Sequence, residues 1–252
     1  MKKFLRNPKN LKTTSPGTIT YVGGDKQHQI NIRMLSYNEN FIAEVEIEDL
    51  KKLEEIKTDD SKIHWINIDG VHDVKLIEKI GGIFNIHPLT LEDIANTTQR
   101  PKYEDYDEYL YYVIKMIYVD RVEKITKTEQ VSFILTEKIV ISFQEQEGDV
   151  FEILRNRLRH NKGRVRKMKS DYLLYTLIDA IIDNYFVVIE KIGEDIEYID
   201  EELIGKTDTT LIHKIHTLKR EILFLRKSLW PLRDVNSAIY RLESAFLSEN
   251  IK

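Results

Sequence analysis

Two long runs of regularly spaced apolar residues in the second half of the chain constrain its fold more than any other feature. Apolar residues recur every 3.5 positions on average, once over residues 174–203 and again over residues 211–232. This spacing places the apolar side chains along a narrow stripe that must pack on another helix. A helix of about 34 residues is about 50 Å long, longer than a small domain is wide. The sequence therefore predicts an elongated antiparallel helical hairpin that leads to a stalk helix.

The first part of the chain has a different pattern, in which short β-like segments alternate with Gly, Pro and Asp. Alternating polarity or β-branched and aromatic content predicts strands over residues 29–35, 41–47, 63–69, 109–119, 131–135 and 139–143. Helical spacing over residues 71–84, and again from about Asp149, places helices between and after them. We expect a mixed sheet covered by helices, an α/β/α sandwich of the α+β or α/β class. The predicted domains are 1–165, the sandwich, and 166–252, the long helices.

Composition excludes several classes of protein. The net charge of −4 is too small to indicate a polyanionic partner. The absence of cysteine excludes disulfides, thiolate metal sites and a cysteine nucleophile. The basic segment 1–10 lacks the apolar core of a signal peptide, and no run of about 18 apolar residues predicts a membrane span. No Gly-rich phosphate loop or nucleophile elbow is present, so an assembly or binding role is favoured over an enzyme.

The acids Glu92 and Asp93 are the first candidates for a cation site. They follow His87 and Pro88, and Pro in a first turn is typical of a helix start. We expect both acids in or near that turn, where helix-end electrostatics alone would explain them. The alternative is a hard-cation site, because Mg²⁺ needs only one or two carboxylates and keeps several waters.

Further acids lie along the first predicted long helix. Asp179 and Asp183 are four residues apart and share a face, so they repel each other unless a cation or a basic partner lies between them. Segment 190–202 holds seven acids and one lysine. Each set is either a solvated face or a cation-attracting surface. The weaker candidates in this segment are Glu194, Asp195, Glu197, Asp200, Glu201 and Glu202.

A basic run and a histidine pair indicate two other functions. Segment 155–169 holds eight Lys or Arg, as a nucleic-acid-binding surface would. No aromatic residue interleaves it, and pairing with an acidic helix in an assembly explains it equally well. His213 and His216 lie one helical turn apart and could hold a transition metal with Glu221 as a third ligand, or be solvated.

Several short segments, in their order and spacing, resemble the cytoplasmic domain of CorA magnesium transporters. They are WINIDG at 65–70, IHPLTLEDI at 86–94, QRPK at 99–102, FQE at 143–145, DYLLY at 171–175, LIDA at 177–180, DNYF at 183–186 and WPLR at 230–233. The resemblance covers residues 17–245. It implies an α/β/α domain followed by long helices, an acidic helix hairpin and a stalk that runs into the membrane.

The resemblance also implies a function. In this family five subunits surround a pore, and divalent ions between neighbouring cytoplasmic domains hold the pore shut. The implied ligands are Glu92, Asp93 and Asp179, with Mg²⁺ as the regulatory and transported ion and Co²⁺ or Zn²⁺ as alternatives. The Gly-Met-Asn pore motif and the two membrane helices are not in this sequence. We therefore expect a soluble fragment from the cytoplasmic face of the membrane, a homopentamer in the full-length protein, without a nucleic-acid partner. A free-standing helical scaffold or nucleic-acid-binding protein is the alternative.

Overall fold

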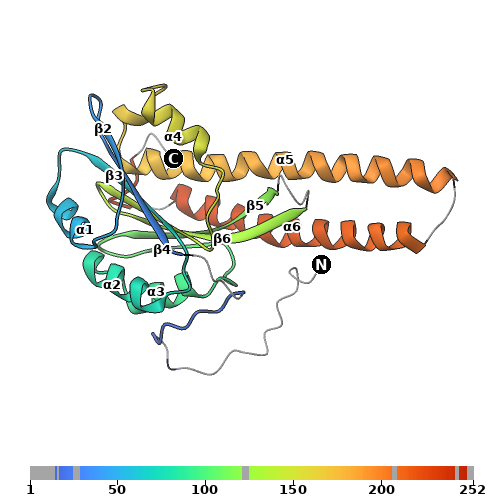
Figure 1. Ribbon diagram of the computed structural model, residues 1–252, viewed down its shortest axis with the longest axis horizontal. Helices are drawn as coiled ribbons and strands as arrows, with labels where there is room; N and C mark the ends of the chain where they lie inside the picture. The colour runs from blue at the N-terminus through green and yellow to red at the C-terminus, as the bar shows by residue number, and fades with distance from the viewer. Residues whose placement is uncertain are drawn as a thin grey trace.

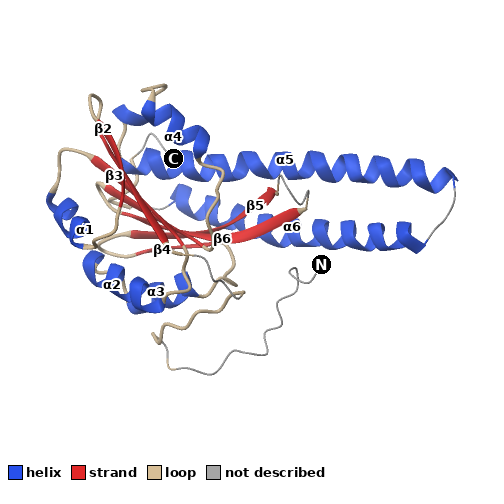
Figure 2. Cartoon of the chain, in the orientation of Figure 1, coloured by secondary structure: helices blue, strands red, loops and turns tan. Residues whose placement is uncertain are grey.

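The computed structural model describes residues 15, 17–24, 29–120, 125–205, 209–241 and 244–248. Within them a seven-stranded mixed sheet carries helices on both faces, and two long helices extend beyond it (Figures 1 and 2). The predicted α/β/α architecture followed by a long-helix hairpin is confirmed. Segment 1–10 and the residues after 248, where the stalk was expected to begin, lie outside the described part of the chain.

The elements follow the predicted order, with two additions. The strands are β1 (Asn31–Tyr37), β2 (Ile42–Glu46), β3 (Ile63–Asp69), β4 (Lys102–Asp105), β5 (Leu110–Val119), β6 (Thr126–Leu135) and β7 (Ile139–Gln144). The helices are α1 (Lys51–Glu55), α2 (Val74–Phe84), α3 (Pro88–Ala95), α4 (Glu152–Arg159), α5 (Ser170–Gly205) and α6 (Thr209–Arg241), with 3₁₀ turns η2 (Ile56–Thr58) and η3 (Val165–Lys167). Helix α1 and strand β4 are the two elements that the sequence pattern did not predict.

The strand order is β2-β1-β3-β7-β6-β5-β4, and β3 and β7 form its parallel pair. Successive side chains of a strand point to opposite faces, so the sheet separates two apolar cores. Trp65 of β3 packs with α4, α5 and α6 on one face, whereas Ile66 and Ile68 pack with α2 and α3 on the other. The helices of the two cores therefore lie on opposite sides of the sheet (Figure 1).

The first half of α5 packs on the sheet as well as on other helices, whereas its apolar spacing predicted only a helix as its partner. Leu177 and Ile181 are fully buried in the core between α5 and the sheet, and the hydroxyl of Tyr185 donates to the carbonyl oxygen of Lys115. Beyond Ile192 the helix leaves the sheet and runs beside α6 (Figure 1). Four members of the predicted stripes are exposed there, namely Ile196, Leu203, Ile215 and Ile222.

One stretch of α5 also has the dimensions of a membrane span, although the sequence has no run of about 18 apolar residues. Among the described residues, Ser170–Leu203 is long enough to cross a bilayer, and its most apolar window has a mean hydropathy of 1.5. However, 39% of that window is buried inside the molecule. A core helix has the same length and composition, and the packing of α5 on the sheet is that of a core helix.

Two adjacent glycines of α2 provide a matched test of how closely α2 packs on α3. A Cβ at Gly81 would lie 2.3 Å from Cδ1 of the buried Leu91, whereas a Cβ at the exposed Gly82 would meet nothing within 4 Å. We expect Gly81→Ala to lower the free energy of unfolding by about 1–3 kcal/mol. Gly82→Ala should raise it by about 0.5–1 kcal/mol, because alanine loses less backbone entropy in a helix. Urea unfolding checks both, and equal effects would contradict this packing.

A buried histidine at the start of β3 makes stability depend on pH. His64 is 1% exposed, its Nδ1 lies 2.8 Å from Ser36 Oγ, and its Nε2 lies 3.7 Å from Asp59 Oδ2. Burial lowers the pKa of His64, and Lys62 adds to this, although Asp59 opposes both. The unfolded chain therefore binds more protons below about pH 6.5, so stability should fall as the pH falls through this range. Chemical unfolding from about pH 7.5 to about 5.5 should show a smaller loss in His64→Gln than in the wild type. Equal losses would contradict the assignment.

Candidate metal centre

The helix that carries Glu92 and Asp93 begins as the sequence indicates, but the acids lie deeper in it than expected. His87 caps α3, its Nδ1 accepting from the amide of Leu89 at 3.2 Å, and Pro88 is the first helical residue. The first turn of α3 contains no acid, because Glu92 and Asp93 follow in the second turn. Their interpretation as helix-end charges is therefore wrong, since the dipole acts mainly within the first turn.

Asp93 is held by a half-buried network of side chains. Its Oδ2 lies 2.6 Å from Lys102 Nζ, and its Oδ1 accepts from Gln99 Nε2 at 2.5 Å. Lys102 also contacts Glu104 Oε1 at 2.6 Å. Neighbouring Glu92 accepts from the amide of Gly17 at 2.8 Å, which fastens the N-terminal segment to α3. Both carboxylates are therefore already engaged within the subunit.

The two carboxylates that share Lys102 have opposite pKa shifts. Burial raises the pKa of Asp93 above its ordinary value, and the contact with Lys102 only partly offsets it. Burial also acts on Glu104, but hydrogen bonds from Lys102 and Tyr106 outweigh it, so the pKa of Glu104 is lowered. A second cation near Asp93 would favour its ionised form.

Asp179 and Asp183 lie on the outer side of α5, as their spacing predicts. Asp179 is half-buried and Asp183 is exposed. Burial and the charge of Asp183 raise the pKa of Asp179, and Arg157 of α4 partly compensates. The pair thus lacks full neutralisation within the subunit, which is the condition under which a shared cation becomes favourable.

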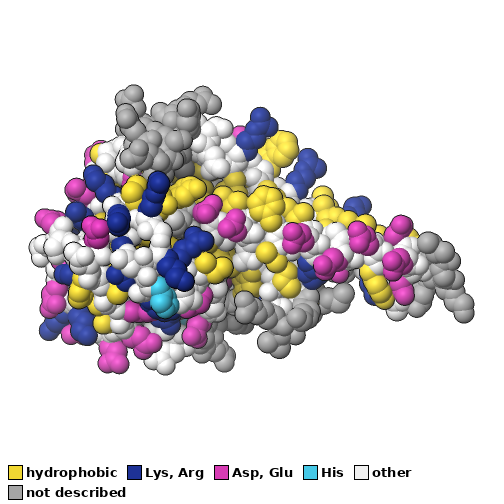
Figure 3. All heavy atoms as spheres, turned by 90° about the horizontal axis from the view of Figure 1, so that it is seen from above, with side chains coloured by type: hydrophobic (Ala, Val, Ile, Leu, Met, Phe, Trp, Pro, Cys, Tyr) yellow, Lys and Arg dark blue, Asp and Glu magenta, His cyan; other side chains and the backbone are white. Residues whose placement is uncertain are grey.

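The acidic stretch of the hairpin is solvent-exposed. In Figure 3 acidic side chains follow the protruding helix pair towards its tip. The exposed members are Glu190, Glu194, Glu197, Asp200, Glu201 and Glu202. Asp195 is half-buried and pairs with Lys191, four residues before it, at 2.5 Å. These acids form a distributed negative surface, and the structure does not draw them together.

The structure does not bring the main candidates together within one subunit. Glu92 and Asp93 lie on α3, below the sheet in Figure 1, whereas Asp179 lies on α5 above it. Within the described ranges, no three His, Asp or Glu side chains are close enough to hold a metal. The donor chemistry nevertheless fits, because carboxylate oxygens are the ligands that Mg²⁺ prefers. The carboxylates of α3 and those of α5 are therefore two separate sets on opposite sides of the sheet.

Four of the eight cations in the basic run make hydrogen bonds or ion pairs within the chain, namely Arg155, Arg159, Arg166 and Lys167. Arg155 is 3% exposed and forms a bidentate pair with Asp149, with Nη–Oδ distances of 2.8 and 2.5 Å. Arg159 binds Glu44 and Glu152, and Arg166 donates to the carbonyl oxygen of Leu158. These cations fasten α4 and η3 to the sheet, so they are poorly placed to track a phosphate backbone.

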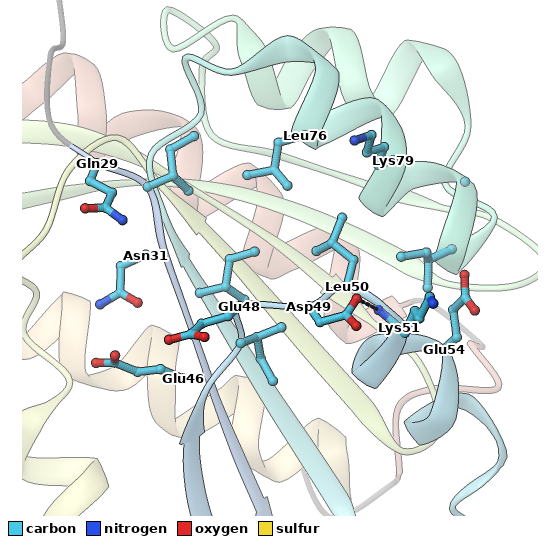
Figure 4. A pocket seen from close by; sticks show the side chains of 15 residues that line it. Gln29, Asn31, Glu46, Glu48, Asp49, Leu50, Lys51, Glu54, Leu76 and Lys79 are labelled. Carbon is cyan, nitrogen blue, oxygen red and sulfur yellow. Dashed lines mark hydrogen bonds between the residues drawn. The ribbon is translucent and has the colours of Figure 1, made fainter.

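A surface pocket of about 1000 Å³ lies away from these acids, between β1, α1 and α2 (Figure 4). Glu46, Glu48 and Asp49 lie on its wall beside apolar side chains, and Lys51 and Lys79 contribute the opposite charge. None of the predicted site residues lines it. The pocket is therefore separate from the candidate metal centre.

Two residues of the network around Asp93 were not predicted as site residues from the sequence. Gln99 and Lys102 belong to the segment QRPK, which the sequence marks only by its resemblance to the CorA family. Nothing in the local sequence reveals that the chain turns back after α3 so that β4 runs beside Asp93.

His213 and His216 are exposed on α6, and Glu221 is half-buried, with its pKa raised by burial.

Solved structures define the class of fold. The full-length CmaX protein matches with a TM-score of 0.72 at 16% identity, over 90% of this chain and 68% of that one. The soluble domain of CorA from Methanocaldococcus jannaschii matches with a TM-score of 0.68 at 13% identity, over 86% and 83%. A sheet domain with a protruding pair of long helices is thus the fold of a CorA soluble domain.

Sequence comparison gives the family. The model of the CorA-like Mg²⁺ transporter proteins matches residues 60–250. The cobalt/magnesium transport protein CorA of Thermotoga maritima is 41% identical over 230 residues, which are 91% of this chain and 65% of that protein. The chain belongs to the CorA-like Mg²⁺ transporter family, and it spans 65% of the length of this relative.

Proposed function

We propose that this chain is the cytoplasmic divalent-cation-sensing domain of a CorA-type transporter. In this proposal Mg²⁺ binds between neighbouring subunits and favours the closed state of a pore formed by a part of the protein beyond the matched region. The full-length protein is a pentamer attached to the membrane through that part. Family membership and the soluble-domain fold support this assignment.

The distribution of the candidate ligands is the observation that carries the proposal. Glu92 and Asp93 lie on one side of the sheet and Asp179 lies on the other. A cation that needs both sets must therefore be shared by two copies. Such a cation stabilises the arrangement in which the copies are close, and its loss lets them separate. This differential affinity is what a sensor requires.

Exposed apolar side chains on the long helices support an assembly of several copies. Phe186 on α5 is 62% exposed and Trp230 on α6 is 64% exposed. Further exposed apolar residues on the two helices are Tyr175, Val187, Ile189, Ile196, Tyr198, Leu203, Ile212, Ile215, Ile222 and Leu223. Large exposed apolar side chains in this number on a protruding helix pair favour contact with another chain.

The ligand chemistry favours Mg²⁺ over the alternative ions as the sensed species. Zn²⁺ and Co²⁺ bind well to imidazole and thiolate, whereas Mg²⁺ takes carboxylate and water oxygens. The candidate set contains only carboxylates, and the chain has no cysteine. The identity of the transported ion, Mg²⁺ or Co²⁺, depends on the pore and is proposed by relation to the family.

Limited proteolysis of the chain tests this function. Millimolar Mg²⁺ should slow cleavage relative to EDTA, because a shared cation holds copies together and removes open conformations. Replacing Mg²⁺ by the same ionic strength of NaCl controls for general screening. Identical cleavage rates in Mg²⁺, NaCl and EDTA would contradict the sensing function.

A further inference from the structure

The ammonium group of Lys102 lies between two carboxylates at the candidate metal centre. Its Nζ is 2.6 Å from Asp93 Oδ2 and 2.6 Å from Glu104 Oε1, and it lies 5.7 Å from the ring centroid of Tyr111. The side chain is 30% exposed, and that of Asp93 is 19% exposed. Water therefore screens this group of charges only partly.

The backbone of β4 keeps Lys102 at this position. Lys102 pairs with Val113 of β5 in the antiparallel ladder, and Glu104 pairs with Tyr111 two residues further on. Residues two apart on a strand share a face, so Glu104 always stays within reach of Lys102. If the ammonium group leaves Asp93, it can remain paired with the carboxylate of Glu104.

We propose that Lys102 is a built-in competitor for the divalent cation at Asp93, and that it sets the cation concentration at which the site fills. A cation that coordinates Asp93 must displace the ammonium group, which then rests on Glu104. This inference depends on the proposed function, because it assumes that Asp93 is a ligand. In this inference Lys102 is the residue that lowers the affinity for Mg²⁺ to the range that a sensor needs.

Two lysine variants separate competition from structural support. Lys102→Met keeps most of the apolar stem and removes the charge. The matched control is Lys127→Met, since Lys127 pairs with Asp120 at 2.5 Å and the exposures of that pair are 27% and 21%. Thermal unfolding of the whole chain is recorded in EDTA and along a Mg²⁺ titration, and the Mg²⁺ concentration at half-maximal stabilisation is read from each series.

In EDTA both variants should unfold at a lower temperature than the wild type, because each removes an ammonium group that contacts a half-buried carboxylate. With Mg²⁺, Lys102→Met should reach half-maximal stabilisation at a concentration about tenfold lower than the wild type, since a nearby positive charge no longer repels the metal. Lys127→Met should keep the wild-type midpoint. Lys102→Arg keeps the charge and should keep the wild-type midpoint or raise it.

The outcomes distinguish this inference from the proposed function. A Mg²⁺ response in the wild type with an unchanged or higher midpoint in Lys102→Met would overturn the competitor role alone. That result would make Lys102 a structural support of the site or a bystander. No Mg²⁺ response in the wild type or in any variant would overturn the proposed function, and the competitor role with it.

Discussion

Arg155→Met should lower the free energy of unfolding by about 3–5 kcal/mol, the largest loss expected from a single substitution outside the apolar core. The side chain of Arg155 is 4% exposed, and its guanidinium group binds both oxygens of Asp149, whose side chain is 6% exposed. It also lies 5.0 Å from the ring centroid of Trp65. Removing it leaves a buried carboxylate without its cation. Chemical unfolding followed by circular dichroism measures the loss.

A double substitution is the control for this prediction. In Arg155→Met with Asp149→Asn the carboxylate that Arg155 contacts is removed together with its cation, so part of the lost stability should return. Lys127→Met breaks a more exposed pair with Asp120 and should cost about 1 kcal/mol or less. A loss below about 1 kcal/mol in Arg155→Met would show that the buried pair does not hold α4 in place.

Asp93→Asn and Asp179→Asn should each abolish most of the Mg²⁺-dependent stabilisation of the chain. A ligand present at ten times its Kd adds about 1.4 kcal/mol to the folded state. For a chain of this size that corresponds to about 3–6 °C in Tm. Asparagine keeps the shape of the side chain but removes the negative charge that a hard cation needs. Thermal unfolding in Mg²⁺ and in EDTA gives the difference for each variant.

Asp120→Asn is the matched control, because Asp120 is also a half-buried acid paired with a lysine. It should change Tm equally in Mg²⁺ and in EDTA. If Asp93→Asn or Asp179→Asn keeps the full Mg²⁺-dependent increase in Tm, the substituted residue is not a ligand of the proposed centre. Loss of the increment in Asp120→Asn as well would point to a general charge effect.

The fold was largely predictable from the local pattern of apolar and polar residues, because burial imposes that pattern on most of the elements. β3 was predicted with its observed bounds because isoleucine and tryptophan dominate this fully buried strand and Gly70 follows it. The helix predicted over 71–84 begins later, at Val74, because Asp73 caps it by accepting from the amide of Leu76 at 3.1 Å. β4 was missed because its sequence, KYED, is mostly charged. Pairing with β5 makes it a strand.

The candidate site was predictable in part. The resemblance supplied Glu92, Asp93 and Asp179, and their roles as ligands stay predictions. Lys102 was not predictable, because its contact with Asp93 depends on how the chain returns along the edge of the sheet. The apolar spacing of α5 indicated a helix correctly, but spacing alone cannot tell a sheet from a helix as the packing partner. The division of the chain at residue 165 also stays a prediction.

Sedimentation velocity of the chain along a Mg²⁺ titration tests the central claim most directly, because a cation shared by two copies must couple binding to association. The weight-average sedimentation coefficient should rise with millimolar Mg²⁺ and return to its starting value in EDTA. The Asp93→Asn and Asp179→Asn double variant should show no rise. A wild-type sedimentation coefficient that stays constant over the whole titration would contradict a cation centre formed between subunits.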